Sequence, residues 1–465
     1  MWKARLPRLE VLVEEDVDRL EQAALMLLEE VGCRFAYPPA LRRFREAGAD
    51  LDGDVVRIDR GLVAQSLELA PPAFTVRGRD PARSVRIGGE HVAIAPTGGA
   101  PFVLDPERGR RPPTAEDHRT FVRLTQAVDQ FHLNEGGIVE PDDLPVATRH
   151  LDMDYDVLRW SNKPYFPVGA SAESSRDSVE LAAIAFGGRD AIAREPVLLG
   201  IVNPISPLQY DERMAGSLTA YAEAGQPVVL MPFVFTGGTA PLGLAGALAQ
   251  TTAEVLAGIV LVQLVRPGTP CVFGSSISEL DLRDGRPRYA TAGHALAMLA
   301  SGQIARRLGL PFRGGGGFTG APSPDARAMQ ESLMALWPAL LSGANVILHA
   351  AGWLEGSLVT SIEKMAQDVA ALEVFERFLQ AELPVNDESL ALDALREVGP
   401  GGTFLGAAHT LRNLRRSIPT GGAGWRSWQD LLDGYEEPGI DPAVDDALRD
   451  YVARRKLELE ARVEV

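Results

Sequence analysis

The chain has 465 residues, of which 46% are hydrophobic and 23% are charged, and its formal net charge is −17. This is the composition of a globular protein with a large core. The acidic balance argues against a nucleic-acid partner, because phosphate binding requires clustered Lys and Arg. It is compatible with a cationic small molecule, although solubility alone also explains it.

The sequence predicts a cytoplasmic location. No apolar run approaches the roughly 18–20 residues of a membrane span, and residues 1–15 lack the apolar region of a secretory signal. The two cysteines, Cys33 and Cys271, lie far apart and fit buried thiols in a reducing compartment. The seven histidines show no zinc-binding spacing, so we expect no metal site.

Residues 1–90 predict a small α+β cap. Apolar residues from Val17 to Val31 recur at helical steps, and Gly32 ends that helix. A second amphipathic helix is expected over residues 39–47. Short strands are expected at 55–58, 74–77 and 84–87, separated by turn residues.

Residues 91–371 predict a (β/α)8 TIM barrel. Eight apolar runs alternate with helical stretches, and this alternation is typical of a parallel sheet. No GxGxxG motif follows the first run, which disfavours an open dinucleotide-binding sheet. The eight runs are 91–95, 131–134, 165–169, 197–202, 227–233, 270–274, 310–313 and 345–349. Residues 372–465 predict a helical tail that packs on the barrel or on a neighbouring subunit.

Functional side chains of a barrel follow the carboxyl ends of its strands. Arg313 and His349 end the seventh and eighth runs, which are neighbours in a barrel. Together they are able to hold a carboxylate, with Arg as a fork and His as a second donor. The alternatives are a simple salt bridge for Arg313 and a core histidine bonded to a carbonyl.

Other strand ends suggest a wall around a cation. Phe233 and Phe235 end the fifth run, and Trp353 follows the eighth; aromatic faces attract quaternary ammonium groups, although core packing is the alternative for each. Asn203 is held by a proline-rich loop after the fourth run. Glu135, after the second run, is a candidate catalytic carboxylate.

Two further segments leave their roles open. Glu355 is a second candidate catalytic carboxylate, and helix capping is the alternative for it as for Glu135. Four consecutive glycines, Gly314, Gly315, Gly316 and Gly317, predict a loop with close backbone approach. They fit a phosphate or a broad flat cofactor group. The next helix is expected to begin with Ser323 as its N-cap.

The chain resembles the trimethylamine methyltransferase superfamily over nearly its whole length. Each matching stretch alone is weak evidence for the family, but the stretches together are specific to it. They include Asn203-Pro204-Ile205-Ser206-Pro207-Leu208, Thr239-Ala240-Pro241-Leu242-Gly243, His349-Ala350-Ala351-Gly352-Trp353-Leu354-Glu355 and His409-Thr410-Leu411-Arg412-Asn413.

The resemblance implies a cytosolic barrel enzyme that moves a methyl group from a methylated amine to cob(I)alamin. A separate corrinoid protein carries this cobalamin cofactor and docks at the barrel mouth. The chain contains only standard residues and therefore resembles the branch without pyrrolysine, which acts on quaternary amines such as glycine betaine. We also expect a homo-oligomer.

Residues 319–327 depart from the family pattern, and this keeps two alternatives open. One is a barrel hydrolase or lyase that uses Glu135, Glu355 and His349 as acid–base groups. The other is a non-catalytic betaine-binding protein.

Overall fold

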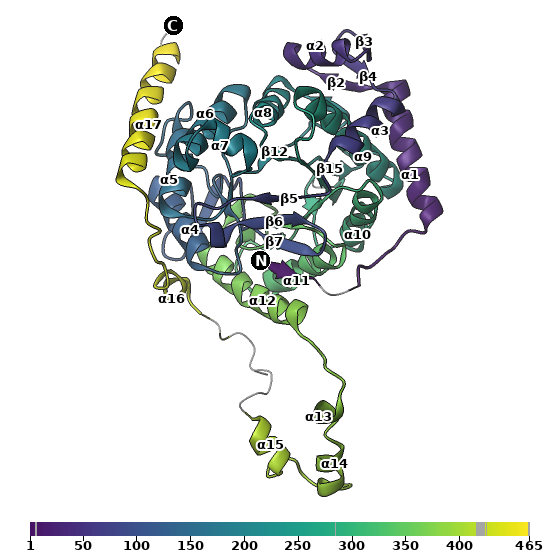
Figure 1. Ribbon diagram of the computed structural model, residues 1–465, viewed down its shortest axis with the longest axis vertical. Helices are drawn as coiled ribbons and strands as arrows, with labels where there is room; N and C mark the ends of the chain where they lie inside the picture. Colours follow the sequence, from purple (N-terminus) through teal and green to yellow (C-terminus); the bar gives the residue numbers. More distant parts are fainter. Residues whose placement is uncertain (5–6, 284, 415–423, 425, 464–465) are drawn as a thin grey trace.

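A parallel β-barrel forms the centre of the computed structural model, which describes residues 1–4, 7–283, 285–414, 424 and 426–463 (Figure 1). Six strands pair in the order β12-β14-β16-β19-β20-β7, and β10 pairs with β11. Hydrogen bonds from His132 N to Ile94 O (2.8 Å) and from Leu199 N to Tyr165 O (3.0 Å) close the ring. The predicted (β/α)8 barrel is confirmed. Its strands are β7 (His91–Ile94), β10 (Asn134–Glu135), β11 (Tyr165–Phe166), β12 (Gly200–Val202), β14 (Val228–Leu230), β16 (Cys271–Gly274), β19 (Phe312–Gly315) and β20 (Val346–Leu348).

Helices connect these strands on the outside of the ring. They are α4 (Ala115–Ala127), α5 (Arg149–Trp160), α6 (Ala172–Phe186), α7 (Arg189–Arg194), α8 (Glu212–Glu223), α9 (Leu244–Val265), α10 (Ala292–Arg307), α11 (Ala326–Leu341) and α12 (Ile362–Gln380). Contrary to the sequence-based expectation, α9 has the length and hydropathy of a membrane span. Because 89% of its most apolar stretch is buried, we assign it as a core helix that is apolar on all sides.

A hairpin closes the amino-terminal end of the barrel. Strands β5 (Ala73–Val76) and β6 (Val85–Gly88) cross the ring in Figure 1, and β6 pairs with β7. Phe74 and Ile87 from this hairpin pack in one cluster with Val272 and Leu348 from inside the barrel. This end is therefore filled by apolar side chains.

The remaining residues of the first ninety lie on the outside of the barrel. Helices α1 (Glu14–Met26) and α3 (Arg60–Leu69) pack against α9. A small sheet joins β2 (Cys33–Phe35), β3 (Asp50–Asp52) and β4 (Val55–Arg57) to β13 (Gln209–Tyr210), which follows β12. Shorter elements are β1 (Trp2–Lys3), the π-helical turn η1 (Leu27–Val31), α2 (Pro38–Glu46) and η2 (Pro81–Arg83).

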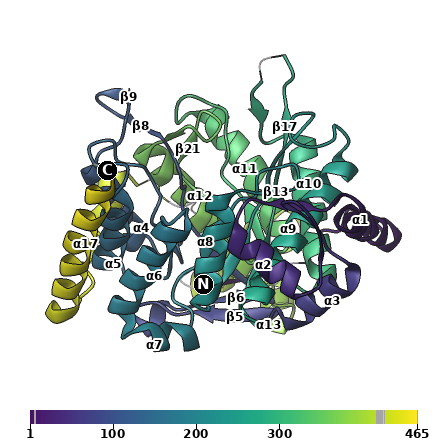
Figure 2. The ribbon, with the colours of Figure 1, turned by 90° about the horizontal axis from the view of Figure 1, so that it is seen from above.

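Strand excursions rise from the carboxyl end of the barrel (Figure 2). These excursions and the loops between them surround the carboxyl end of the barrel, which is where barrel enzymes generally have their active sites. They are β8 (Phe102–Asp105) with β9 (Gly109–Arg111), β15 (Phe233–Thr236) with β17 (Ser276–Leu280) and β18 (Pro287–Arg288), and β21 (Trp353–Leu354) with β22 (Val359–Thr360).

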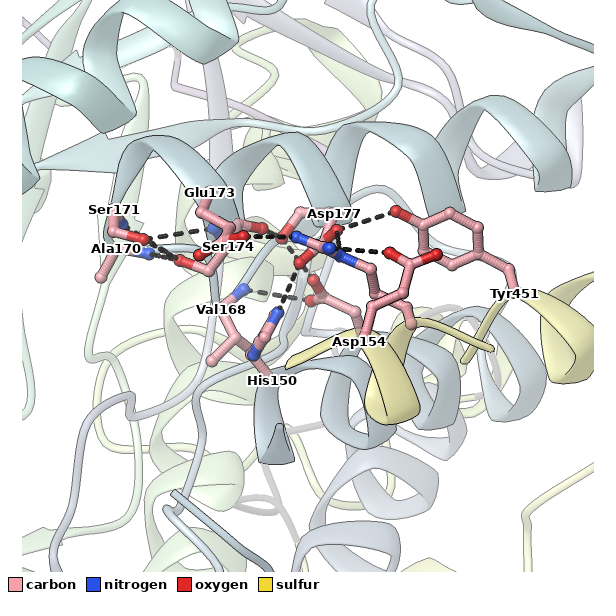
Figure 3. A network of polar contacts seen from close by, with 12 residues as sticks. His150, Asp154, Val168, Ala170, Ser171, Glu173, Ser174, Asp177 and Tyr451 are labelled. Atoms are coloured by element: carbon pink, nitrogen blue, oxygen red, sulfur yellow. Dashed lines mark hydrogen bonds and ion pairs between the residues drawn. The ribbon is translucent and has the colours of Figure 1, made fainter. Parts of the chain in front are cut away.

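The tail has two different parts. Helix α12 begins ten residues before the predicted boundary at 372 and leads into α13 (Asp387–Leu390), α14 (Leu392–Val398) and α15 (Ala408–Asn413), which stand away from the barrel in Figure 1. Helices α16 (Trp428–Leu432) and α17 (Pro442–Val463) return to it. The Asp177 carboxylate of α6 accepts hydrogen bonds from Tyr451 (2.8 Å) and Arg455 (2.7 Å), and it also contacts His150 (Figure 3).

Candidate active site

Arg313 lies inside the barrel at the carboxyl end of β19. It pairs in register with Val346, a residue of the inner barrel core, so its side chain faces inward. The residue is fully buried, and none of its three guanidinium nitrogens has a hydrogen-bond partner among the described residues. A buried charge is very costly unless it is paired. This guanidinium therefore calls for an anionic ligand.

Glu135 lies at the corresponding end of β10. It pairs with Phe166 of the inner core, so it also faces inward. Burial raises the pKa of Glu135 to about 8, against a weaker opposing effect of a hydrogen bond from Gly137 N (3.1 Å) and of the Arg313 charge. Burial lowers the pKa of Arg313, and the Glu135 charge opposes this with a weaker effect that raises it. Because a guanidinium keeps its proton at physiological pH, a neutral Glu135 leaves Arg313 uncompensated.

His349 follows β20 in a strained backbone conformation, with φ of +67°. Such strain in a non-glycine residue concentrates at functional sites. Its ring lies 5.5 Å from the Phe318 ring and 5.4 Å from the Trp353 ring. Burial and the Arg313 charge lower the pKa of His349 well below its usual value, so the imidazole is neutral. Its Nδ1 has no hydrogen-bond partner among the described residues.

More polar atoms at this end of the barrel lack partners in the part of the chain that the structure describes. They are the hydroxyls of Thr97 and Ser276 and the indole nitrogen of Trp353. Thr97 follows β7 and Ser276 follows β16, so five strand ends, with Glu135, Arg313 and His349, carry polar groups. Buried polar groups are normally hydrogen-bonded. A polar ligand would satisfy them.

The three aromatic residues expected to form a wall lie in two places. Phe233 and Phe235 on β15 form an edge-to-face pair with ring centres 4.9 Å apart. Both rings are partly exposed, and Phe233 also packs against the inner barrel core. Trp353 is 2% exposed and sits beside His349 instead. Asn203 is exposed in the loop after β12.

The structure does not bring the two predicted catalytic carboxylates together in one network. Glu355 is partly exposed in the turn after β21 and pairs with Arg110 Nε at 3.7 Å. The Arg110 guanidinium in turn stacks on the Phe102 ring at 4.1 Å. The surroundings of Glu355 are those of a surface ion pair.

The glycine run was predicted as a loop, and this is wrong for its first half. Gly314 and Gly315 belong to β19, because pairing with β20 holds them in the sheet. A Cβ on Gly315 would lie 2.5 Å from the Phe318 ring, and one on Gly317 would lie 2.7 Å from the carbonyl oxygens of His349 and Ala350. The run is buried under the chain's own atoms, including Gly316 under Leu336, and these glycines do not fit a cofactor cradle.

The following helix also begins differently from the expectation. Asp325 is the N-cap, and its side chain accepts from Ala328 N at 2.9 Å. Ser323 donates to Asp325 at 2.9 Å instead of capping. The loop between strand and helix is anchored by Glu331, which accepts from Thr319 Oγ1 (2.6 Å) and Gly320 N (2.8 Å).

The sequence reasoning missed a group of residues around His349. Tyr289 and Phe318 stack with ring centres 4.9 Å apart, and His294 lies edge-on to both. Phe318 directly follows the glycine run. A glycine at 315 leaves room for a nearby ring, so the run itself was a signal that the Phe318 ring packs against it. Thr97 and Ser276 follow strand ends in the sequence and were open to the same reasoning as Arg313.

Comparison with known proteins assigns the family. The sequence model of the trimethylamine methyltransferase (MTTB) family matches residues 1–418 and 422–460. The chain belongs to this family. It is an amine methyltransferase by this membership.

Named relatives cover nearly the whole chain. A glycine betaine methyltransferase of Desulfitobacterium hafniense is 38% identical, over 98% of each chain. A proline betaine:corrinoid methyltransferase of Eubacterium limosum is 29% identical, over 96% of this chain and 92% of its own. The crystal structure of the Methanosarcina barkeri monomethylamine methyltransferase matches the fold with a TM-score of 0.53 at 12% identity, over 96% of this chain and 88% of its own.

Proposed function

We propose that this enzyme transfers a methyl group from a quaternary amine that carries a carboxylate, with glycine betaine as the leading substrate. The acceptor is the Co(I) of a corrinoid that a separate protein carries. The observation that carries the substrate assignment is the buried, unpartnered guanidinium of Arg313. Two relatives named for betaines, one of them a corrinoid methyltransferase, support it.

Arg313 binds the substrate carboxylate as a two-pronged donor, and neutral His349 supplies a second donor from its ring. Glu135 is a positioning residue. While it holds its proton, it adds no negative charge that would compete for the Arg313 guanidinium. The Phe233 ring, which packs against the inner core, faces the ammonium group and replaces its water.

The bound corrinoid supplies the nucleophile that accepts the methyl group. The quaternary nitrogen is already a cationic leaving group, so this chain needs no acid to release it. The residues hold the substrate in one orientation and keep water away from the nitrogen. Exposed Asn203 and partly exposed Phe235 are the residues that we expect to face the corrinoid protein. The glycines 314–317 have no such role, because they are buried.

Calorimetric titration of betaine and choline tests the carboxylate site. Replacing Arg313 with Met removes a charge-assisted contact of about 1.5–3 kcal/mol, so we expect betaine affinity to fall roughly 10- to 150-fold. Choline has no carboxylate, and its affinity should not fall. The control is Arg327→Met, which removes a 60% exposed side chain paired with Glu331. Equal losses for betaine and choline in Arg313→Met would refute the carboxylate assignment.

A further inference from the structure

The segment 381–414 exposes an unusual amount of apolar surface. It follows α12 and contains α13, α14 and α15, which stand clear of the barrel in Figure 1. We call this segment the arm. Its large exposed apolar side chains include Leu383 (90% exposed), Val385 (75%), Leu390, Leu392, Leu395, Phe404, Leu405 (86%) and Leu411.

The arm has almost no core of its own. Within this fully described segment, the buried residues are Ala394 and Ala407. Its three helices have four to seven residues each, and a hollow of about 710 Å³ lies between α13–α14 and α15. So little burial does not offset the entropy lost on ordering a chain of this length. The arm therefore needs a partner surface to hold its shape.

A matching apolar band lies next to the root of the arm. Trp337 of α11 contacts Phe378 of α12 with ring centres 5.4 Å apart. Met334 lies one turn before Trp337, and Val374 lies one turn before Phe378. These four side chains are 37–50% exposed. Contiguous exposed apolar surface of this kind marks protein–protein contacts.

We propose that the arm packs on a second copy of this chain, with each arm covering the Met334–Phe378 band of the other copy. Because α12 runs directly from the band into the arm, a two-fold axis beside α12 brings each arm onto its partner's band. Such a contact is self-complementary, as two-fold dimers require. Burying the eight arm side chains removes on the order of 800 Å² from water, which is about one partner's share of a standard stable interface.

The position of the arm favours a second copy over the corrinoid protein. In Figure 2, α13 lies toward the β5–β6 end of the barrel, whereas the β8–β9 and β17 excursions rise at the other end. The polar strand ends of the candidate site lie at that other end. A protein docked over the site would not cover the arm.

Sedimentation velocity of the full chain tests this proposal. We expect a dimer, and we expect Leu383→Glu combined with Leu405→Glu to raise its dissociation constant at least 100-fold, because both side chains belong to a buried centre. The matched control is Leu457→Glu, whose side chain is 70% exposed on α17. It should leave the dimer unchanged. A monomeric wild type, or a dimer that survives the double arm substitution, would overturn the proposal.

Cross-linking between copies tests which surface the arm covers. The natural Cys33 and Cys271 are buried, so introduced cysteines will react selectively. A mixture of Leu405→Cys and Phe378→Cys chains should give a mixed cross-linked dimer with a flexible bis-maleimide. The same cross-link formed only within one chain that carries both cysteines would show a folded-back arm and overturn the proposal. A mixture of Leu405→Cys with Leu457→Cys is the control and should not cross-link.

Discussion

Replacing Glu135 with Gln is expected to stabilise the protein, and increasingly so as the pH rises. The unfolded chain loses the Glu135 proton near its ordinary pKa of 4.5, whereas burial raises the pKa in the folded protein to about 8. Between these values the folded state binds more protons, so this group lowers the free energy of unfolding as the pH rises. Glutamine carries no such proton and retains an oxygen for Gly137 N.

The size of the effect follows from the two pKa values. Each pH unit between them is about 1.36 kcal/mol, so the gain approaches roughly 3 kcal/mol at pH 7 and roughly 5 kcal/mol at pH 8 and above. Near pH 4.5 the two proteins should be equally stable apart from packing differences.

Urea unfolding of both proteins at pH 5, 6, 7 and 8 measures the difference directly. The matched control is Glu331→Gln. Hydrogen bonds and the Arg327 charge lower the pKa of Glu331, so this substitution should destabilise the protein above pH 4.5. A difference between wild type and Glu135→Gln that stays constant with pH would refute the idea that Glu135 is held protonated by burial.

Three further outcomes are expected. Betaine affinity should fall above about pH 8 in the wild type, because Glu135 ionises there and competes for Arg313. In Glu135→Gln the affinity should stay constant. Calorimetry at pH 7 and 9 checks this, and a parallel fall in both proteins would contradict it. Gly315→Ala should cost about 1–3 kcal/mol by displacing the Phe318 ring, measured by urea unfolding, and a neutral effect would mean that this packing is loose. Lys364→Met should cost about 3–5 kcal/mol because it leaves the buried Asp368 carboxylate unpaired, and adding Asp368→Leu should restore most of the loss; additive losses would contradict the pairing.

The barrel strands and helices were predictable because their signals are local. Each of the eight apolar runs overlaps a barrel strand, although β10 and β19 extend beyond the ends of their runs. Apolar runs bounded by turns and helices are typical of buried parallel strands. The start of helix α12 was missed because the N-cap Ser361, whose side chain accepts a hydrogen bond from Lys364 N, was not recognised. The α9 helix illustrates the opposite limit, because apolar composition alone does not separate a core helix from a membrane span.

The site was predictable where the strand position decides it. Arg313 and Glu135 face inward because the period of two along a strand, counted from apolar neighbours, fixes the side. His349 follows the end of β20 with a positive φ, so this period does not fix the direction of its side chain. Glu355 lies in the four-residue turn between β21 and β22, where it pairs with Arg110, and local sequence does not reveal this contact. Gly314 and Gly315 belong to β19 because they pair with β20, and Gly315 also packs against the Phe318 ring. Neither contact is visible in the local sequence.

Methyl transfer to free cob(I)alamin under anaerobic conditions tests the central claim most directly. The panel is glycine betaine, proline betaine, carnitine, choline and trimethylamine, and the visible spectrum reports methylcobalamin. The account predicts turnover with a carboxylate-bearing quaternary amine, glycine betaine first, and its loss in Arg313→Met. Turnover with choline or trimethylamine in preference to every betaine, or no turnover with any compound despite calorimetric binding of betaine, would contradict it.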